Sequence, residues 1–127
     1  MLVRDVMTPA VLTVGPAHTV RQVARQMAAR RVGAAVVHDP DSEGPGILTE
    51  RDVLEAVAAG QDLDTELAAD HLTPEAVVGT PDWDLDRAAA AMVSGGFRHL
   101  VICEAGEVVG VLSVRDVVKA WSAARTT

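Results

Sequence analysis

Apolar residues recur with helical spacing in two segments of the chain, and the second segment repeats the first. The spacing i, i+3, i+4, i+7 places the apolar side chains of each segment on one face of a helix. The residues that show it are Val20, Val23, Ala24 and Met27, and then Leu85, Ala88, Ala89 and Met92. Thr19 and Asp84 precede them and are suited to N-cap positions. The pattern predicts two equivalent amphipathic helices, 65 positions apart in the sequence.

The segments around these helices also share an order of elements. A short helical turn, ended by Thr-Pro, is followed by a strand, the helix, a hairpin and a final helix. The predicted ranges are 2–7 and 67–72 for the turns, 11–14 and 76–78 for the first strands, 34–38 with 46–48 and 100–103 with 108–112 for the hairpins, and final helices that begin near 49 and 113. Gly60 is expected to cap the first final helix. We expect an α+β fold of two β-α-β-β-α repeats, related by a pseudo-two-fold axis and packed through their small sheets.

Residue identities support a duplication. A shift of 65 positions aligns Leu2, Asp5, Thr8, Pro9, Pro16, Ala24, Met27 and Val36 with Leu67, Asp70, Thr73, Pro74, Pro81, Ala89, Met92 and Val101, and a shift of 64 aligns Gly46, Leu48, Arg51, Asp52, Val53 and Ala56 with Gly110, Leu112, Arg115, Asp116, Val117 and Ala120. Repeat 1 is predicted at 1–61, a linker at 62–65 and repeat 2 at 66–127. A chain of 127 residues is long enough to bury one core, so we expect the repeats to form one module.

Composition and charge narrow the function classes. The chain is 49% hydrophobic and 23% charged, which is typical of a globular protein. Its net charge of −7 disfavours non-specific binding to nucleic acid. One cysteine, Cys103, permits no internal disulfide, and no apolar run reaches the length of a membrane span. We therefore expect a cytoplasmic protein with neither a nucleic acid nor a membrane as its partner.

The stretch from Gly46 to Asp52 is matched by the stretch from Gly110 to Asp116, and it allows two interpretations. A hydroxyl followed by an acid three residues later forms a capping box at the start of a helix, which needs no ligand. The same helix start also suits phosphate or sugar oxygens, and a carboxylate there accepts hydrogen bonds from two vicinal hydroxyls, as in a ribose. Arg51 and Arg115 precede the acids and either reach an anion or form an exposed ion pair with a nearby glutamate.

These motifs resemble a known family. The duplicated Thr-Pro opening, the strand from Arg98 to Ile102 and the paired Gly-to-Asp stretches are similar to a tandem cystathionine-β-synthase (CBS) domain pair, or Bateman module, over essentially the whole chain. The resemblance implies a non-catalytic sensor that binds AMP, ADP or ATP, or else NAD or S-adenosylmethionine, in clefts between the repeats as a regulatory ligand. It requires no cofactor, forms a homodimer through its outer helices, and transmits the bound state to an effector protein whose identity is unknown.

The resemblance also implies two sets of ligand-binding residues. The first set comprises Thr49, Asp52, Thr73, Ala76, Val77, Arg98 and His99, and the second comprises Ser113, Asp116, Thr8, Ala10 and Val11. The second set has Gly33 and Ala34 where a cation would help to bind a phosphate. We therefore expect the Asp52 site to prefer a phosphorylated nucleotide, and the Asp116 site to bind weakly, to take a less charged adenosine compound or to stay empty.

Other functions compete with the sensor. An interaction or oligomerisation module with vestigial clefts is the main alternative, and the alanine-rich stretch from Ala88 to Val93, with Leu85 and Met92, suits a homodimer contact as well as a core. We expect no catalytic residues, because no nucleophile elbow or phosphate loop is present and because Cys103 and His99 lie too far apart along one strand to form a dyad. We expect no metal either, since His18, His38, His71, His99 and Cys103 match no ligand spacing within one chain.

Overall fold

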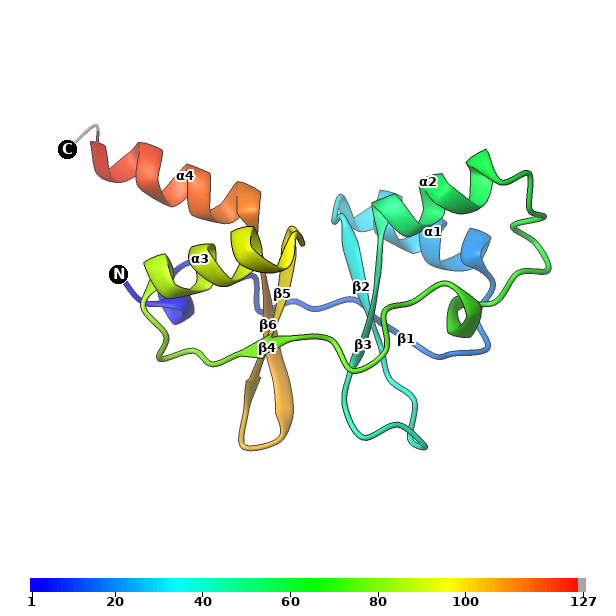
Figure 1. Ribbon diagram of the computed structural model, residues 1–127, viewed down its shortest axis with the longest axis horizontal. Helices are drawn as coiled ribbons and strands as arrows, with labels where there is room; N and C mark the ends of the chain where they lie inside the picture. The colour runs from blue at the N-terminus through cyan, green and yellow to red at the C-terminus, as the bar shows by residue number, and fades with distance from the viewer. Residues whose placement is uncertain (126–127) are drawn as a thin grey trace. The chain divides into compact units, whose positions relative to one another are not determined.

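The computed structural model describes residues 1–125 and shows a mixed α+β fold with two three-stranded sheets and four α-helices (Figure 1). This confirms the predicted fold class. The elements in chain order are η1 (Val3–Asp5), β1 (Thr13–Val14), α1 (Val20–Arg30), β2 (Ala34–Val37), β3 (Gly46–Thr49), α2 (Glu50–Ala58), η2 (Ala68–Asp70), β4 (Val78–Gly79), α3 (Leu85–Gly95), β5 (His99–Glu104), β6 (Glu107–Ser113) and α4 (Val114–Arg125).

The elements gather into two compact units. Unit 2 is the continuous segment Leu12–Ala76, whereas unit 1 combines Met1–Val11 with the described residues from Val77 onward. The opening segment of the chain therefore belongs with the second hairpin, and the segment that follows α2 belongs with the first. The boundaries predicted for the repeats themselves, 1–61 and 66–127, stay a prediction, and residues 126 and 127 lie outside the described residues.

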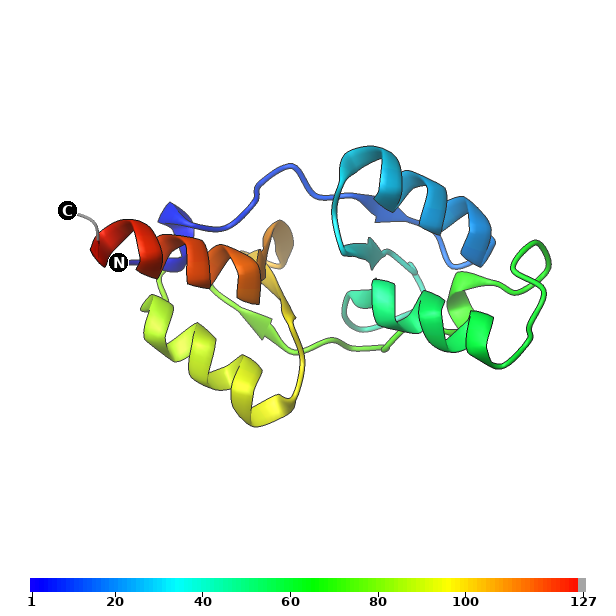
Figure 2. The same cartoon turned by 90° about the horizontal axis from the view of Figure 1, so that it is seen from above.

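Unit 2 is a small sheet covered by two helices. β2 lies in the centre, parallel to β1 and antiparallel to β3, with Ala34 opposite Thr49 and Val37 opposite Gly46. Its core consists of Leu12, Val14, Val23, Met27, Ala35, Val37, Leu48 and Ala68. The predicted N-cap at Thr19 is confirmed, since its side chain accepts a hydrogen bond from the backbone N–H of Gln22. Figure 2 shows α1 and α2 side by side over this sheet.

Unit 1 repeats the arrangement with longer strands. β5 lies between β4, to which it is parallel, and β6, to which it is antiparallel. The hairpin turns through Ala105 and Gly106, both of which have positive φ, and a β-bulge interrupts the pairing between Ile102 and Cys103. The core consists of Val3, Leu85, Ala88, Met92, Leu100, Ile102, Leu112 and Val117. Helices α3 and α4 pack side by side, as in Figure 2.

The opening segment is tied into unit 1 by its backbone. The N–H of Val3 donates to the Trp83 carbonyl at 2.9 Å, and the N–H of Leu85 donates to the Met1 carbonyl at 2.9 Å. Arg4 forms an exposed ion pair with Asp82, whose hydrogen bond and charge raise the pKa of the Arg4 guanidinium. Because Val3 has no exposed surface, this segment forms part of the core of unit 1.

Four details differ from the sequence expectations or sharpen them. The first strand of each repeat is shorter than predicted, because the N–H groups of Val11 and Ala76 bond instead to the carbonyls of Pro9 and Pro45. The first hairpin was predicted one residue too long at the end of β2 and one residue too short at the end of β3, and both strands of the second hairpin were predicted one residue short at each end. Gly60, with φ of 73°, lies one residue beyond the C-cap Ala59. The α3 stripe of Leu85, Ala88 and Met92 is at most 1% exposed and belongs to the core, so it does not form a dimer contact.

Candidate functional site

In unit 2, the Thr-Pro segment pairs with the strand that leads into α2. Thr73 and Ile47 exchange two backbone hydrogen bonds, of 2.9 and 3.0 Å, and the N–H of Ala76 donates to the Pro45 carbonyl at 2.8 Å. The segment comes this close because residue 46 is a glycine, whose Cβ would lie 3.1 Å from Cδ1 of Leu72. Of the first predicted set, Thr49, Asp52, Thr73 and Ala76 therefore lie on neighbouring segments of one unit.

Unit 1 contains the same construction. Thr8 and Val111 exchange backbone hydrogen bonds of 2.9 and 3.0 Å, and a Cβ at Gly110 would lie 2.7 Å from Sδ of Met7. The strand that pairs with Thr8 ends at Ser113, where α4 begins. All five residues of the second predicted set, namely Thr8, Ala10, Val11, Ser113 and Asp116, thus belong to unit 1.

The aspartates form capping interactions in both units, so the structural interpretation of the motif is correct. Oδ2 of Asp52 accepts hydrogen bonds from the N–H of Thr49 at 2.7 Å and from its hydroxyl at 3.2 Å. Oδ2 of Asp116 accepts from the N–H of Ser113 at 2.9 Å, and the Ser113 hydroxyl oxygen accepts from the N–H of Asp116 at 3.0 Å. All four hydrogen bonds are part-buried. Because each cap uses Oδ2, the Oδ1 atom of each carboxylate takes no part in it.

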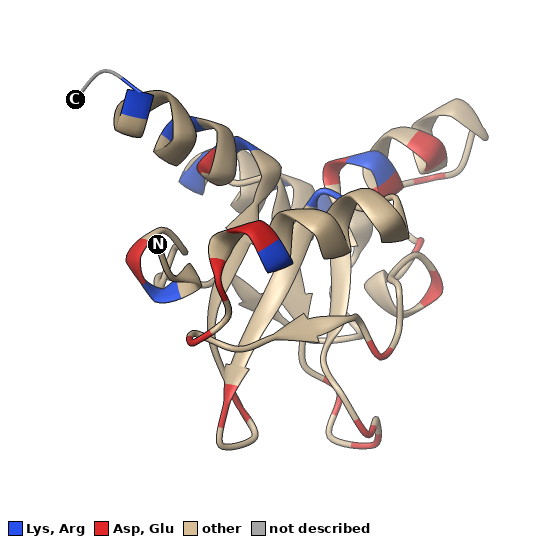
Figure 3. Cartoon of the chain, turned by 60° about the vertical axis from the view of Figure 1, so that its left-hand side comes forward, with Lys and Arg blue, Asp and Glu red and all other residues tan. Residues whose placement is uncertain are grey.

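The cations near these caps differ in their surroundings. Nε of Arg51 lies 3.2 Å from Oε1 of Glu55 on the exposed face of α2, which is the ion pair that the sequence allowed. Arg98 is exposed and precedes β5, and its carbonyl accepts the N–H of Val114 at 2.9 Å. Figure 3 shows Lys and Arg along α4 and acidic residues at both hairpin turns. An anion on unit 1 is therefore favoured at the α4 end of the hairpin rather than at its turn.

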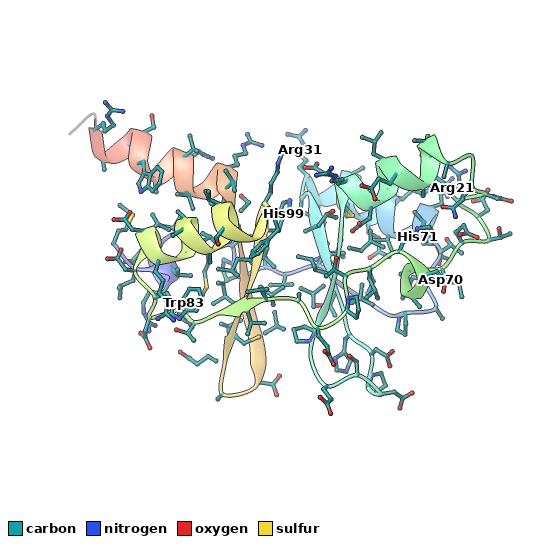
Figure 4. The ribbon with its side chains drawn as sticks, in the orientation of Figure 1. Arg21, Arg31, Asp70, His71, Trp83 and His99 are labelled. Carbon is teal, nitrogen blue, oxygen red and sulfur yellow. The ribbon has the colours of Figure 1, made fainter. Side chains whose placement is uncertain are left out.

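The first predicted set also includes residues of unit 1. Val77, Arg98 and His99 belong to that unit, whereas the rest of the set belongs to unit 2. Their assignment to the Asp52 site stays a prediction. His99 lies at the start of β5 (Figure 4). In the antiparallel register it is directly opposite Ser113 on β6. Sequence reasoning missed this pairing, because the bulge at Ile102 and Cys103 moves the register by one residue from that of a regular hairpin.

Two of the other histidines have polar partners within unit 2, and the cysteine is partly buried. Nε2 of His71 lies 2.9 Å from Oε1 of Glu66, and Nδ1 of His18 accepts the N–H of Gly15 at 2.9 Å. Burial raises the pKa of the Cys103 thiol. Within residues 1–125, no three His, Cys, Asp or Glu side chains are placed to hold a metal ion together. None of the described helices is both long and apolar enough to cross a membrane.

Two equivalent sheet-and-helix units, each with an aspartate cap at the start of its last helix, make the chain a tandem pair of one duplicated domain. Residues 3–59 and 68–123 each match the CBS domain family. The chain therefore belongs to the CBS-domain proteins and carries the domain twice, as the resemblance indicated. Proteins of this kind are typically regulatory rather than catalytic.

Individual relatives support this membership. The chain is 33% identical over 119 residues to an uncharacterised 17.7 kDa protein of Acidianus ambivalens, covering 93% of this chain and 71% of the relative. A CBS-domain protein of Agrobacterium tumefaciens has a similar structure, with a TM-score of 0.85 and 34% identity over 94% of this chain and 92% of that one. The structure of a CBS domain protein of Pyrobaculum aerophilum complexed with AMP gives a TM-score of 0.83 with 29% identity, covering 97% of this chain and 99% of that one. Some relatives are much longer, since the chain spans 41% of one from Methanocaldococcus jannaschii.

Proposed function

We propose that this chain is a non-catalytic sensor that binds adenosine-containing ligands, such as AMP, ADP or ATP, and transmits the bound state to a partner protein. The observation that supports it most is the duplicated cap, which leaves one carboxylate oxygen of Asp52 and of Asp116 outside the cap at the start of a helix. A carboxylate oxygen outside the cap suits the hydroxyls of a ribose, and the helix start suits a phosphate. The Pyrobaculum relative, complexed with AMP, supports the ligand class.

We assign the ligand contacts as the resemblance implied. Asp52 and Asp116 hold the ribose, and the Thr-Pro segments, which are paired with the strands before the caps, line the base. Thr73 and Ala76 have this role for Asp52, and Thr8, Ala10 and Val11 have it for Asp116. Val77, Arg98 and His99 complete the Asp52 set in that assignment. Because a ligand shifts an equilibrium only by its differential affinity for two states, transmission requires that the ligand favour one conformation of the module.

The test compares Asp52→Asn, Asp116→Asn and the double variant with the wild type. Asparagine keeps an acceptor for the cap but removes the charge, so the fold is retained. Thermal unfolding is followed with AMP, ADP, ATP, NAD and S-adenosylmethionine. A ligand at a hundred times its Kd stabilises the folded state by about 2.7 kcal/mol, and the double variant is expected to lose this shift. Asp41→Asn, at an exposed position in the β2–β3 turn, is the matched control and should keep it. An unchanged wild-type Tm with all five compounds would overturn the sensor function.

A second function, self-association, is supported by a separate observation. Exposed apolar residues occupy equivalent positions on the last helix of each unit, Leu54 and Val57 on α2 and Val118 and Trp121 on α4. Leu54 is 66% exposed and Trp121 is 44% exposed, which is unusual for large apolar side chains repeated on helices. We propose that these helices carry self-association, so that the chain also acts as an oligomerisation module.

The oligomeric state tests this second function directly. Light scattering is expected to show a dimer for the wild type and a monomer for the pair of changes Leu54→Glu and Val118→Glu. Val93→Glu is the matched control, because Val93 is 82% exposed on α3, outside the proposed face. A wild-type protein that stays monomeric at high concentration would contradict self-association.

A further inference from the structure

The last helices of the two units, α2 and α4, share exposed apolar positions but carry opposite net charge. Large apolar side chains that are at least 44% exposed occupy the same two positions on both helices, namely Leu54 and Val57 on α2 and Val118 and Trp121 on α4. The charged residues are Glu50, Arg51, Asp52 and Glu55 on α2 and Arg115, Asp116, Lys119 and Arg125 on α4. Formal net charge is therefore −2 on α2 and +2 on α4, where Figure 3 shows Lys and Arg along the helix.

One charged residue of each helix lies on the face that carries the apolar side chains. Glu50 is four residues before Leu54 on α2, and Arg125 is four residues after Trp121 on α4. Side chains four residues apart are neighbours on the surface of a helix. A helix that packs on these apolar side chains therefore meets an acid at the start of α2 and a base at the end of α4.

Glu55 and Lys119 give the two helices opposite charge at one equivalent position. They are 64 residues apart, which is the shift that aligns the two caps, and both are exposed. Glu55 pairs with Arg51 on its own helix, but 66% of its side chain remains exposed. Because an exposed pair of this kind contributes little energy, Glu55 is still accessible to a charge on another chain.

These charges distinguish two ways in which a second copy could pack on the helices. The apolar side chains favour both ways equally, because they are repeated on α2 and α4. When α2 packs on α2 and α4 on α4, each contact brings together two helices of the same net charge. When α2 of one copy packs on α4 of the other, each contact brings together opposite net charges. Facing like charges disfavour the first arrangement, so the second is the more stable.

We infer that two copies of this chain associate with α2 of one copy packed on α4 of the other. This inference rests on the self-association proposed above, and it adds which surfaces meet. Under two-fold symmetry such a dimer contains the contact twice, once from each copy. A change of charge on either helix therefore acts at both contacts, which makes the Kd of the dimer a sensitive measure of the arrangement.

The test exchanges the charges of the two helices. The α2 variant is Glu50→Lys with Glu55→Lys, the α4 variant is Lys119→Glu with Arg125→Glu, and the exchange variant carries all four changes. Each of the first two gives both helices the same sign of charge, whereas the exchange variant restores opposite signs. Sedimentation equilibrium measures the dimer Kd of each variant, and thermal unfolding checks that each is folded.

A matched control separates the helix charges from the net charge of the chain. Glu43→Lys with Glu107→Lys changes two exposed acids beside the hairpin turns, outside both helices, and shifts the net charge by as much as the α2 variant does. Since the chain has a net charge of −7, this shift lowers the general repulsion between two copies. The control should therefore not raise the Kd.

The α2 variant and the α4 variant are each expected to raise the dimer Kd at least about tenfold, because two charges at each of two contacts change from attraction to repulsion. The exchange variant should return to within about threefold of the wild-type Kd. An equimolar mixture of the α2 and α4 variants should also dimerise about as well as the wild type, since each variant then meets helices of opposite charge. The mixture thus shows that both variants remain able to associate.

Three results would overturn the inference. An unchanged Kd in both the α2 and the α4 variant would mean that like helices pair, because such contacts join charges of one sign before and after each reversal. Tighter association of the α2 variant with weaker association of the α4 variant would mean that net charge governs the Kd. An exchange variant as weak as the α2 and α4 variants would exclude the crossed contact. A wild type that is monomeric at high concentration would instead contradict self-association itself.

Discussion

The two units fill two equivalent core positions, one on the first strand and one on the second strand of each sheet, with side chains of different size. Unit 2 has Val14 on β1 and Ala35 on β2, whereas the equivalent positions of unit 1 hold Gly79 and Leu100. A Cβ at Gly79 would lie 3.0 Å from Cδ2 of Leu100 and 3.1 Å from the Trp83 ring. The glycine therefore leaves the room that the larger side chain fills. What the repeats share is the volume at this place in the core, not the residue at each position.

The ends of the first long helices show a second difference. Arg31 follows α1 with φ of 55°, and Gly96 follows α3 with φ of 71°. The N–H groups of Arg31 and Val32 bond to the carbonyls of Ala28 and Met27, and those of Gly96 and Phe97 bond to Val93 and Met92. Both helices thus end with the same left-handed turn, but unit 2 makes it with a residue that has a side chain.

Changes at Gly79 and Leu100 are expected to have the largest effect on the free energy of unfolding. Leu100→Ala should lower the free energy of unfolding by about 2–5 kcal/mol through cavity formation, and Gly79→Val should lower it by about 1–3 kcal/mol through overpacking. The double variant should lose less than the sum, because the valine side chain introduced on β4 would fill part of the space left by Leu100. Urea unfolding reports this through the fluorescence of Trp83 and Trp121, which both belong to unit 1.

The reciprocal pair in unit 2, Val14→Gly with Ala35→Leu, provides the control for this comparison. If volume is what the units share, this pair should also lose less than the sum of its single changes. Strict additivity in both units would show that each position is packed independently. The interpretation that the two cores share a summed side-chain volume would then be wrong.

Alanine substitutions at Gly46 and Gly110 are expected to lower the free energy of unfolding by smaller amounts, which differ between the two positions. A Cβ at Gly110 would lie 2.7 Å from Sδ of Met7 and 3.1 Å from the Thr8 carbonyl, whereas one at Gly46 would lie 3.1 Å from Leu72 and 3.4 Å from the Thr73 carbonyl. Gly110→Ala should therefore cost about 1–3 kcal/mol, and Gly46→Ala less than about 1 kcal/mol. Urea unfolding followed by circular dichroism measures both. An equal cost would mean that the closer contact in unit 1 is relieved by the flexible Met7 side chain.

The helices, hairpins and caps could be predicted because their signals are local. Thr19 and Asp84 both act as side-chain N-caps, and the apolar spacing placed Val23 and Met92 in the cores. The N-terminal ends of β1 and β4 could not be predicted. The N–H groups of Val11 and Ala76 bond to the carbonyls of Pro9 and Pro45, and the alternation of apolar residues in a strand does not indicate these partners.

The candidate site was predictable in part for the same reason. The acid and hydroxyl of each cap are three residues apart, so the sequence alone indicated their contact. The pairing of His99 with Ser113 depends on one bulge elsewhere in the hairpin, and counting back from the turn at Ala105 and Gly106 without it gives a different partner. A local sequence pattern therefore does not give the register in which two strands pair.

The smallest expected effect concerns the helix ends. Arg31→Gly should be more stable than Arg30→Gly by about 1 kcal/mol, because glycine adopts a positive φ without strain but weakens the last turn of α1, which Arg30 completes. Both changes remove one positive charge near the same helix end, so the loss of a favourable interaction with the helix dipole is common to both. The difference between their free energies of unfolding therefore isolates the backbone contribution.

Gly96→Arg, the reverse change in unit 1, tests the helix ends from the opposite side. It should destabilise the protein by about 1 kcal/mol, since no atom lies within 4 Å of a Cβ at Gly96 and the strain of the left-handed backbone is left as the main cost. Urea midpoints at a constant m value would measure both helix ends on one scale. If Arg31→Gly is instead less stable than Arg30→Gly (Figure 4 shows Arg31), the Arg31 side chain must make a contact worth more than the strain it carries.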